Sequence, residues 1–250
     1  MPTSELSRIN DCAKRPIDIW TNYLYYPLSI RLVYILRKTP VTPNELTLLS
    51  MFICFVGCVF WGFGGRDNLS IGLLFVQLSY VIDCADGQLA RYKKMFSSIG
   101  GWLDQVSDRV KEFAIYFSLA YGYTRTHGTE MWIWKWTLIA LFTLYLLEYL
   151  AQIQPKPRHG VDVVAVGASG NVPPSHEQYD GQRADLFARA QKWRGFVPFR
   201  GFIIGEQYFA QLVFLAFGAI VPFFHFVSFL GLAMCVYRPL VQFYKLNRGR

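Results

Sequence analysis

The sequence predicts an all-α integral membrane protein with six transmembrane helices and an N-terminal interfacial amphipathic helix. Hydrophobic residues make up 53% of the 250 residues, and charged residues only 17%. Crossing the hydrocarbon core of a bilayer takes roughly 20 consecutive apolar residues in a helix. Apolar runs of suitable length follow one another along the chain, at 46–63, 69–90, 99–123, 131–153, 203–221 and 223–244.

The distribution of lysine and arginine predicts which side of the membrane each connection faces. One alternate set of connections is strongly basic, whereas the other holds only Arg66, Arg125 and Lys135. Because cytoplasmic loops carry the excess of positive charge, we expect a protein of the cytoplasmic membrane with both termini on the cytoplasmic side. The net charge of +8 fits basic membrane edges that attract anionic lipid. The basic residues are scattered along those edges and do not gather on one soluble face, which argues against nucleic acid as a partner.

The chain divides into an N-terminal part and a transmembrane part. Residues 1–43 are expected to form a cytoplasmic N-terminus, in which 17–38 alternates aromatic and aliphatic residues with a few charges. That pattern is typical of an amphipathic helix in the membrane interface, with a kink expected at Pro27. The six-helix domain then occupies 44–250. Within it, 154–201 is rich in Pro, Gly, Ser and Val, and is predicted to be a cytoplasmic loop insertion.

Four aspartates interrupt two of the apolar runs. One segment is Asp83–Arg91 (DCADGQLAR), and the next is Gly100–Asp108 (GGWLDQVSD). An ionised carboxylate at the centre of a membrane helix costs at least about 2.5 kcal/mol, so it needs a partner. Helical spacing gathers these residues on one face of each helix. The first face carries Asp83, Asp86, Gly87, Ala90 and Arg91, and the second carries Gly100, Asp104 and Asp108.

The link between these two segments, residues 92–99, is short, so we expect antiparallel neighbouring helices whose acidic faces converge. Arg91, Arg109 and Lys111 can neutralise part of the charge, but converging carboxylates also require cations. All-oxygen ligands suit Mg²⁺ or Mn²⁺. Gly87 and Gly100 lie one turn from a carboxylate, where a side chain would block a ligand. Two metal ions can clamp the oxygens of an in-line displacement, so the pattern predicts phosphate chemistry.

The two segments together resemble the signature of the CDP-alcohol phosphotransferase family, D-x2-D-G-x2-A-R-x8-G-x3-D-x3-D. All eight fixed positions are met within 26 residues, and the six-helix layout with an amphipathic N-terminal segment is similar too. The resemblance implies a membrane transferase that moves a phosphoalcohol group from a CDP-alcohol donor to an acceptor hydroxyl and releases CMP. CDP-diacylglycerol is the first choice of donor, as in phospholipid synthesis. A homodimer is typical of the family.

The resemblance also implies roles for the acidic residues and their neighbours. Asp83, Asp86 and Asp104 would hold two metal ions, and Asp108 would ligate one of them and act as general base on the acceptor hydroxyl. On the donor side, Gly87 and Gly100 would let the cytidine and pyrophosphate approach. The remaining candidate donor contacts are Ala90 and Arg91 of the signature and, at the entry to the first spanning helix, Asn44 and Thr47. For Asn44, a role as the cap of that helix explains its position as well as a nucleotide contact does.

The acceptor is less well defined by the sequence. Arg200 and Arg238 stand where family members often keep phosphate-binding cations, and Arg109 follows the last aspartate as in members that join inositol phosphates. Arg238 also fits an arginine that extends toward the cytoplasmic edge of the membrane. Many relatives with phosphorylated acceptors carry a basic residue near the end of the fourth helix, but residues 148–152 (EYLAQ) contain none. A neutral acceptor therefore stays open.

Three other functions are weighed against this one. A transferase of the same family would use a soluble CDP-polyol such as CDP-inositol. A divalent metal transporter is a different class, because acidic residues inside membrane helices also mark ion pathways. The aspartates cluster toward one side, with no acidic relay toward the other face, which disfavours transport. The complete aspartate set gives no support to a catalytically inactive scaffold.

Overall fold

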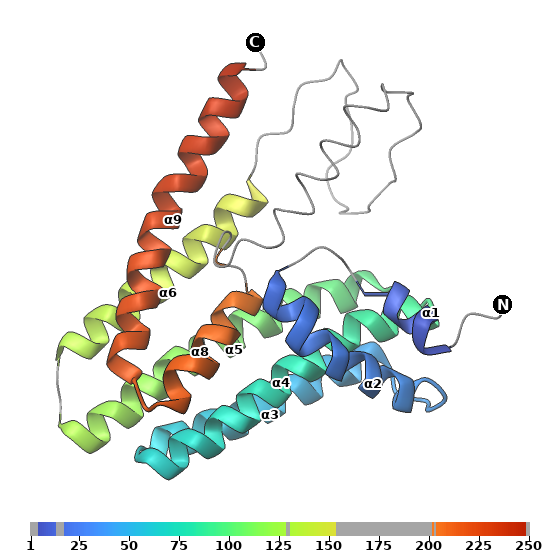
Figure 1. Ribbon diagram of the computed structural model, residues 1–250, viewed down its shortest axis with the longest axis horizontal. Coiled ribbons are helices and arrows are strands. Elements are labelled where there is room, and N and C mark those ends of the chain that lie inside the picture. Colours follow the sequence, from blue (N-terminus) through green and yellow to red (C-terminus); the bar gives the residue numbers. More distant parts are fainter. Residues whose placement is uncertain (1–4, 14–17, 129–130, 154–201, 203, 249–250) are drawn as a thin grey trace.

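The computed structural model describes residues 5–13, 18–128, 131–153, 202 and 204–248. Within these residues the chain is almost wholly helical and forms no β-strand (Figure 1). The fold class is therefore all-α, as the sequence predicts. The predicted loop insertion at 154–201, and with it Arg200, lies outside the described residues.

Two helices and a π-helical turn precede the first long helix. Helix α1 spans Glu5–Asp11, the π-helical turn η1 spans Thr21–Tyr25, and α2 spans Tyr26–Leu36. Helix α1 was not predicted. Pro27 lies in the first turn of α2, where the missing N–H of proline costs little. It therefore marks the start of a helix, and the kink expected there is replaced by the change from π-helix to α-helix.

Within the described residues, four helices are long and apolar enough to cross a membrane, as expected of a multi-pass integral membrane protein. They are α3 (Pro43–Phe63), α4 (Arg66–Lys93), α6 (Met131–Gln152) and α9 (Ile220–Arg248), whose apolar stretch is Ile220–Tyr244. These four correspond to the first, second, fourth and sixth predicted spans. A proline and side-chain caps mark the starts of two long helices, with Pro43 in the first turn of α3 and Ser97 capping α5. In particular, Thr42 and Glu45 form a capping box before α3, so Thr42, not Asn44, is the cap.

The other two predicted spans differ from a simple apolar crossing. Helix α5 (Ser98–His127) has 30 residues, ample length for a bilayer, but it carries the acidic and basic residues of the second segment. Helix α8 (Ile204–Ala216) has 13 residues and is only about 20 Å long, shorter than the hydrocarbon core of roughly 30 Å. It ends there because Gly218 adopts a positive φ of 73°, and the chain turns into α9.

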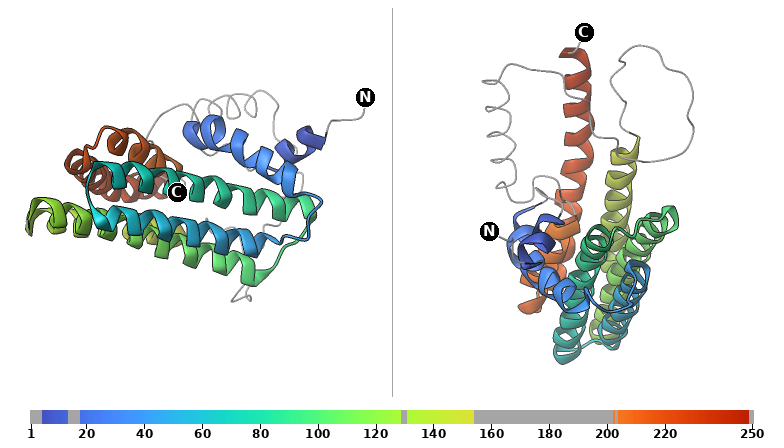
Figure 2. Two further views of the ribbon diagram at one scale, coloured as in Figure 1. Left: turned by 90° about the horizontal axis from the view of Figure 1, so that it is seen from below. Right: turned by 90° about the vertical axis from the view of Figure 1, so that its right-hand side faces the viewer.

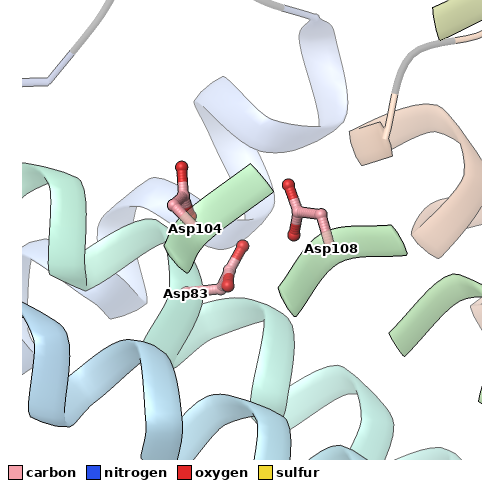
Figure 3. Close-up of side chains that lie close together, drawn as sticks. All are labelled: Asp83, Asp104 and Asp108. Carbon is pink, nitrogen blue, oxygen red and sulfur yellow. The ribbon is translucent and has the colours of Figure 1, made fainter. Parts of the chain in front are cut away.

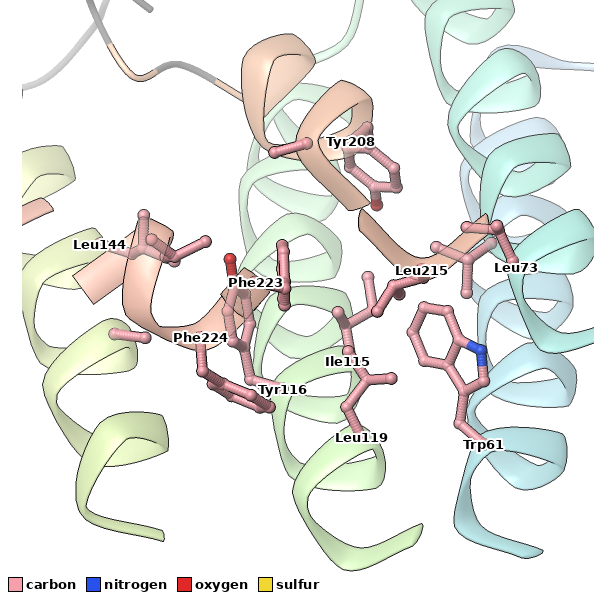
Figure 4. Packing of buried hydrophobic residues seen from close by; sticks show 14 of the residues in the cluster. Trp61, Leu73, Ile115, Tyr116, Leu119, Leu144, Tyr208, Leu215, Phe223 and Phe224 are labelled. Atoms are coloured by element: carbon pink, nitrogen blue, oxygen red, sulfur yellow. The ribbon is translucent and has the colours of Figure 1, made fainter. Parts of the chain in front are cut away.

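The helices form two groups that meet along α8 and where α5 contacts α6. Helix α3 packs against both α4 and α5, while α6 packs against α9, and α8 contacts α4 and α9. Figure 2 shows α3, α4 and α5 running side by side, with α2 lying across α4 at one end. Aromatic and aliphatic side chains fill the space between the groups (Figure 4). The labelled core residues include Trp61 of α3, Tyr116 and Leu119 of α5, and Phe223 and Phe224 of α9.

Candidate active site

Three carboxylates meet at the end of the bundle that α2 covers. One oxygen each from Asp83, Asp104 and Asp108 lies within 4.8 Å of the other two (Figure 3). Asp83 comes from the C-terminal half of α4, and the other two come from successive turns of α5. The predicted convergence of the two acidic faces is thus seen for these three residues.

The short link between the two acidic helices predicts that they pack against each other, but in the structure they do not pack closely. Each packs on α3 instead, and the backbones of α4 and α5 hardly approach one another. The space between them at this end holds the acidic side chains and the side chain of Lys111, and the rest of it is a cavity. Separated backbones leave room for a bound group between the carboxylates, which close packing would exclude.

Asp86 stands slightly apart from the other three aspartates. Its side chain is only 6% exposed, and its Oδ2 accepts a hydrogen bond of 2.6 Å from the Oγ1 of Thr47 on α3. It is not among the carboxylates that lie within 4.8 Å of one another, although it lines the same cavity. Thr47, predicted as a nucleotide contact, is therefore seen here as the partner that orients Asp86.

Two further polar residues belong to the cluster. The Oγ of Ser50 on α3 lies 2.8 Å from the backbone oxygen of Thr47 and 3.2 Å from Oδ1 of Asp83, and its one proton is shared between these two acceptors. Lys111 on α5 is 1% exposed, and its Nζ forms an ion pair with Oδ1 of Asp83 and lies 3.1 Å from Oδ1 of Asp108. From the sequence, Lys111 has only a general neutralising role, and Ser50 does not stand out. Helical spacing is the signal that points to both, because Lys111 lies three residues after Asp108 and Ser50 three residues after Thr47.

All four aspartates line one cavity of about 600 Å³. Gly87 and Arg91 of α4 also line it, on the part of the wall predicted to bind the donor. Elsewhere the wall includes Arg109, Glu148 and Arg238, from α5, α6 and α9. Gly87 and Arg91 of the predicted donor contacts thus share one space with the acceptor candidates Arg109 and Arg238. The other predicted donor contacts do not line this cavity: Asn44, Thr47, Ala90 and Gly100.

The donor-side residues have distinct local environments. A Cβ at Gly87 would lie 3.4 Å from the guanidinium of Arg91, an ordinary contact distance, so the glycine leaves that face of the guanidinium uncovered. The Nε of Arg91 donates to the backbone oxygen of Cys12, which follows α1. A Cβ at Gly100 would lie 2.7 Å from Oδ1 of Asn44, so this glycine makes room for Asn44. The carbonyl of Ala90 accepts a hydrogen bond from the N–H of Met95 and closes the end of α4.

The two arginines on the opposite part of the wall, Arg109 and Arg238, each contact other residues of the protein. Arg109 forms an ion pair of 2.7 Å with Glu112 and lies over the ring of Tyr145. Arg238 donates through NH1 to the backbone oxygen of Leu147 at 3.2 Å. Both side chains nevertheless line the cavity.

The donor set fits a hard divalent cation. All the acidic ligands are carboxylates, the oxygen ligands that Mg²⁺ and Mn²⁺ prefer. Thr47 binds one oxygen of Asp86, and Ser50 and Lys111 share one oxygen of Asp83. Such outer hydrogen bonds hold a carboxylate in place while its second oxygen serves as a ligand.

The fold and the site together define a helical membrane protein with a carboxylate-lined cavity at one end of its bundle. The family model for CDP-alcohol phosphatidyltransferase matches residues 40–169, more than half of the chain. The chain belongs to that family. The match includes the helices α3, α4 and α5 and the whole aspartate signature.

Two curated relatives match the chain over part of its length. The bifunctional IPC transferase and DIPP synthase of Aquifex aeolicus is 29% identical over 109 residues, which are 43% of this chain and 23% of the relative. The archaetidylinositol phosphate synthase of Pyrococcus horikoshii is 26% identical over 144 residues, 58% of this chain and 65% of the relative. The chain therefore spans about a quarter of the first relative and somewhat under two thirds of the second.

Solved structures share the fold. A crystal structure of the Mycobacterium tuberculosis phosphatidylinositol phosphate synthase with CDP-DAG bound aligns with a TM-score of 0.57 at 18% identity, covering 86% of this chain and 94% of that one. A structure of the same enzyme in complex with manganese and citrate gives a TM-score of 0.54, with 86% and 88% covered. At this level of identity the comparison establishes the helical arrangement.

Proposed function

We propose that the protein is a CDP-alcohol phosphotransferase, which moves a phosphoalcohol group from a CDP-alcohol onto an acceptor hydroxyl and releases CMP. The observation that carries the proposal is the complete eight-position signature, whose four aspartates line one cavity of about 600 Å³. Family membership supports the reaction class. The site and both termini are proposed to face the cytoplasm, from the lysine and arginine distribution, and the protein is proposed to act as a homodimer.

The metal centre in this proposal consists of Asp83, Asp86, Asp104 and Asp108, with two Mg²⁺ or Mn²⁺ ions. When bound, the ions would neutralise charge on the pyrophosphate oxygens and on the departing CMP. The protein's own contribution is to hold the carboxylates in place, through Thr47 for Asp86 and Ser50 for Asp83. The manganese complex of the mycobacterial enzyme, which has the same fold, supports a divalent ion here.

On the donor side, the proposal assigns Gly87, Gly100 and Arg91 to the cytidine and pyrophosphate, with Ala90, Asn44 and Thr47 as flanking contacts. Gly87 leaves the guanidinium of Arg91 free of a neighbouring side chain. Arginine suits this position because its N–H groups form charge-assisted hydrogen bonds with phosphate oxygens. The neighbouring contact of Arg91 with the carbonyl of Cys12 would orient it toward the cavity that it lines.

The catalytic base in this proposal is Asp108. An alcohol is a poor nucleophile at neutral pH, and a carboxylate within hydrogen-bond reach can take its proton during attack. Asp108 lies one turn beyond Asp104 on α5, and lines the cavity together with Arg109, Glu148 and Arg238. An acceptor bound by those residues would bring its hydroxyl to Asp108.

Arg238 is proposed to bind a phosphate of the acceptor, with Arg109 and, outside the described residues, Arg200 as further cations. Glu148 adds a carboxylate to the same wall, where it can accept hydrogen bonds from hydroxyl groups. Two cations with one carboxylate suit a phosphorylated polyol, and the name of the Pyrococcus relative, an archaetidylinositol phosphate synthase, favours an inositol phosphate. The donor is proposed to be CDP-diacylglycerol, with a soluble CDP-polyol such as CDP-inositol as the alternative.

The test is a substrate screen with the full chain purified in detergent. CDP-diacylglycerol and CDP-inositol are each combined with serine, glycerol phosphate, inositol phosphate or inositol, and the release of CMP and the lipid or soluble product are measured. We expect CMP release with one donor and one acceptor, and none from the Asp104→Asn variant. A divalent metal transporter or an inactive scaffold would release no CMP in any combination.

A further inference from the structure

A buried lysine is an unusual companion for a centre that is to bind divalent cations. Lys111 is 1% exposed, and its ammonium contacts Oδ1 of Asp83 and lies 3.1 Å from Oδ1 of Asp108. It therefore shares two of the proposed metal ligands with any ion that they hold. The signature of the family fixes neither this residue nor its spacing, so its role is a separate question.

The charge of Lys111 acts on the centre in two ways. Without metal, it offsets part of the repulsion among Asp83, Asp104 and Asp108, whose oxygens lie within 4.8 Å of one another. With metal, a positive charge that shares two carboxylates with a divalent ion opposes the binding of that ion, and the low dielectric of the site strengthens this repulsion. No other lysine among the described residues forms an ion pair with these aspartates.

We propose that Lys111 is a positioning residue that acts as a fixed cation of the metal centre. It holds Asp83 and Asp108 in place when no ion is bound, and it keeps the divalent-ion affinity lower than the carboxylates alone would give. This inference rests on the proposed function, because it assumes that these aspartates bind divalent ions. Its consequence is a centre that remains ordered without metal and exchanges its ions readily.

A purely structural role for Lys111 makes the opposite prediction. If the lysine only braced the carboxylates, its removal would misplace Asp83 and Asp108 and weaken metal binding. If its charge opposes the ions, its removal strengthens metal binding, even though the metal-free protein becomes less stable. The direction of the change in metal affinity therefore separates the two roles.

The experiment measures Mn²⁺ binding to the full chain in detergent, without nucleotide, by the electron paramagnetic resonance signal of free Mn²⁺. The variants are Lys111→Met, Lys111→Gln and Lys111→Arg. Lys93→Met is the matched control, since Lys93 is a partly buried lysine near the end of α4 that donates to the backbone oxygens of Thr39 and Val41. Thermal unfolding in EDTA and in Mn²⁺ is recorded for each protein.

We expect Lys111→Met and Lys111→Gln to bind Mn²⁺ on the order of tenfold more tightly than the unaltered protein. Both should unfold at a lower temperature in EDTA, and Mn²⁺ should raise their unfolding temperature by more than it does for the unaltered protein, because tighter binding stabilises the folded state further. Lys111→Arg, which keeps the charge, and Lys93→Met should match the unaltered protein in Mn²⁺ affinity.

Weaker or unchanged Mn²⁺ binding by both neutral variants would overturn the inference and leave Lys111 as a brace. Tighter binding by Lys111→Arg as well would also overturn it, because the charge would then not be the cause. Asp104→Asn reports separately on the proposed function. If the unaltered protein binds Mn²⁺ no better than Asp104→Asn, the metal centre itself is wrong, whatever Lys111 does.

Discussion

The cavity is built differently by the two groups of helices that surround it. On the side of α3 and α4, hydrogen bonds fix the functional groups. Thr47 holds Asp86, and Ser50 holds Asp83. On the side of α6 and α9, the polar groups are the long side chains of Glu148 and Arg238, and NH1 of Arg238 donates to the backbone oxygen of Leu147. We therefore expect the proposed reaction centre to be held more rigidly than the proposed acceptor wall, because long side chains have more rotatable bonds than short hydroxyl side chains.

Helices α3 and α4 approach each other closely, which favours a rigid first side. Gly57 and Gly72 face each other, and a Cβ on Gly57 would lie 2.8 Å from the carbonyl oxygen of Gly72. Small residues let two membrane helices pack this closely. The short hydroxyl side chains of α3 can then reach the carboxylates of α4, which longer distances between the helices would prevent. Four predictions test whether this side governs the chemistry and the other side governs recognition.

The largest effect is expected from loss of the metal centre. Asp83→Asn, Asp86→Asn and Asp104→Asn should each abolish nearly all CMP release, beyond the roughly 10²–10⁴-fold that the loss of a general base costs. Chelation with EDTA should do the same, and Mg²⁺ or Mn²⁺ should restore the activity. The measurement is CMP release at increasing metal concentration. Full turnover after exhaustive chelation would remove metal ions from the proposal, and a variant with near-normal turnover would show that its aspartate is not a necessary ligand.

The second effect separates Asp108 from the other aspartates. Asp108→Asn preserves the size of the side chain but removes its basicity, so turnover should fall by about 10²–10⁴-fold while donor affinity largely survives. Asp104→Asn should weaken metal and donor binding together. Donor affinity and single-turnover rate are compared for both variants at saturating metal. Equal loss of donor binding in the two variants would make Asp108 mainly a metal ligand, with the base elsewhere.

The long apolar helices and the three aspartates that meet are the features that the sequence predicts best. Apolar runs locate α3, α4, α6 and α9, and helical spacing places Asp83, Asp104 and Asp108 where their oxygens can meet. Both depend on periodicity within a single helix, which a sequence displays directly. The gap between α4 and α5 was not predicted, because it depends on both helices packing against α3.

The features that the sequence does not predict depend on contacts between distant segments. The burial of Lys111 between Asp83 and Asp108 depends on how α5 is turned relative to α4. Helix α1 is anchored by tertiary contacts, since the completely buried Ile9 packs in a core cluster with residues of α2, α3 and α4. The early end of α8 depends on the backbone of Gly218, and an apolar run alone does not reveal it.

The third prediction addresses the other side of the cavity. If Arg238 meets a phosphate of the acceptor, Arg238→Ala should raise the acceptor KM while leaving donor affinity nearly unchanged. Loss of a hydrogen bond to a charged group is worth roughly 1.5–3 kcal/mol, which corresponds to about tenfold or more. Steady-state kinetics with each substrate varied in turn provide the measurement. Unchanged acceptor kinetics would favour an arginine that only reaches the membrane edge, and a neutral acceptor would become the better choice.

The smallest effect on catalysis is expected from the packing of α3 against α4. Gly57→Ala places a methyl group 2.8 Å from the carbonyl oxygen of Gly72 and 2.9 Å from Cγ2 of Val76. The carbonyl is part of a helix backbone and cannot move aside cheaply, so overpacking should lower the free energy of unfolding by roughly 1–3 kcal/mol.

Gly62→Ala is the matched control on the same helix, because a Cβ there meets only Cδ1 of Tyr121, at an ordinary contact distance of 3.7 Å. Both variants gain the same intrinsic preference of alanine for the helix, so the difference between their unfolding free energies isolates the contact with α4. Thermal or denaturant unfolding in detergent gives that difference. Equal stability would mean that α3 and α4 can separate without cost, and the rigid side of the cavity would then be no more rigid than the other. A lower stability of Gly57→Ala with both KM values unchanged would show that the packing supports the centre without itself contacting either substrate.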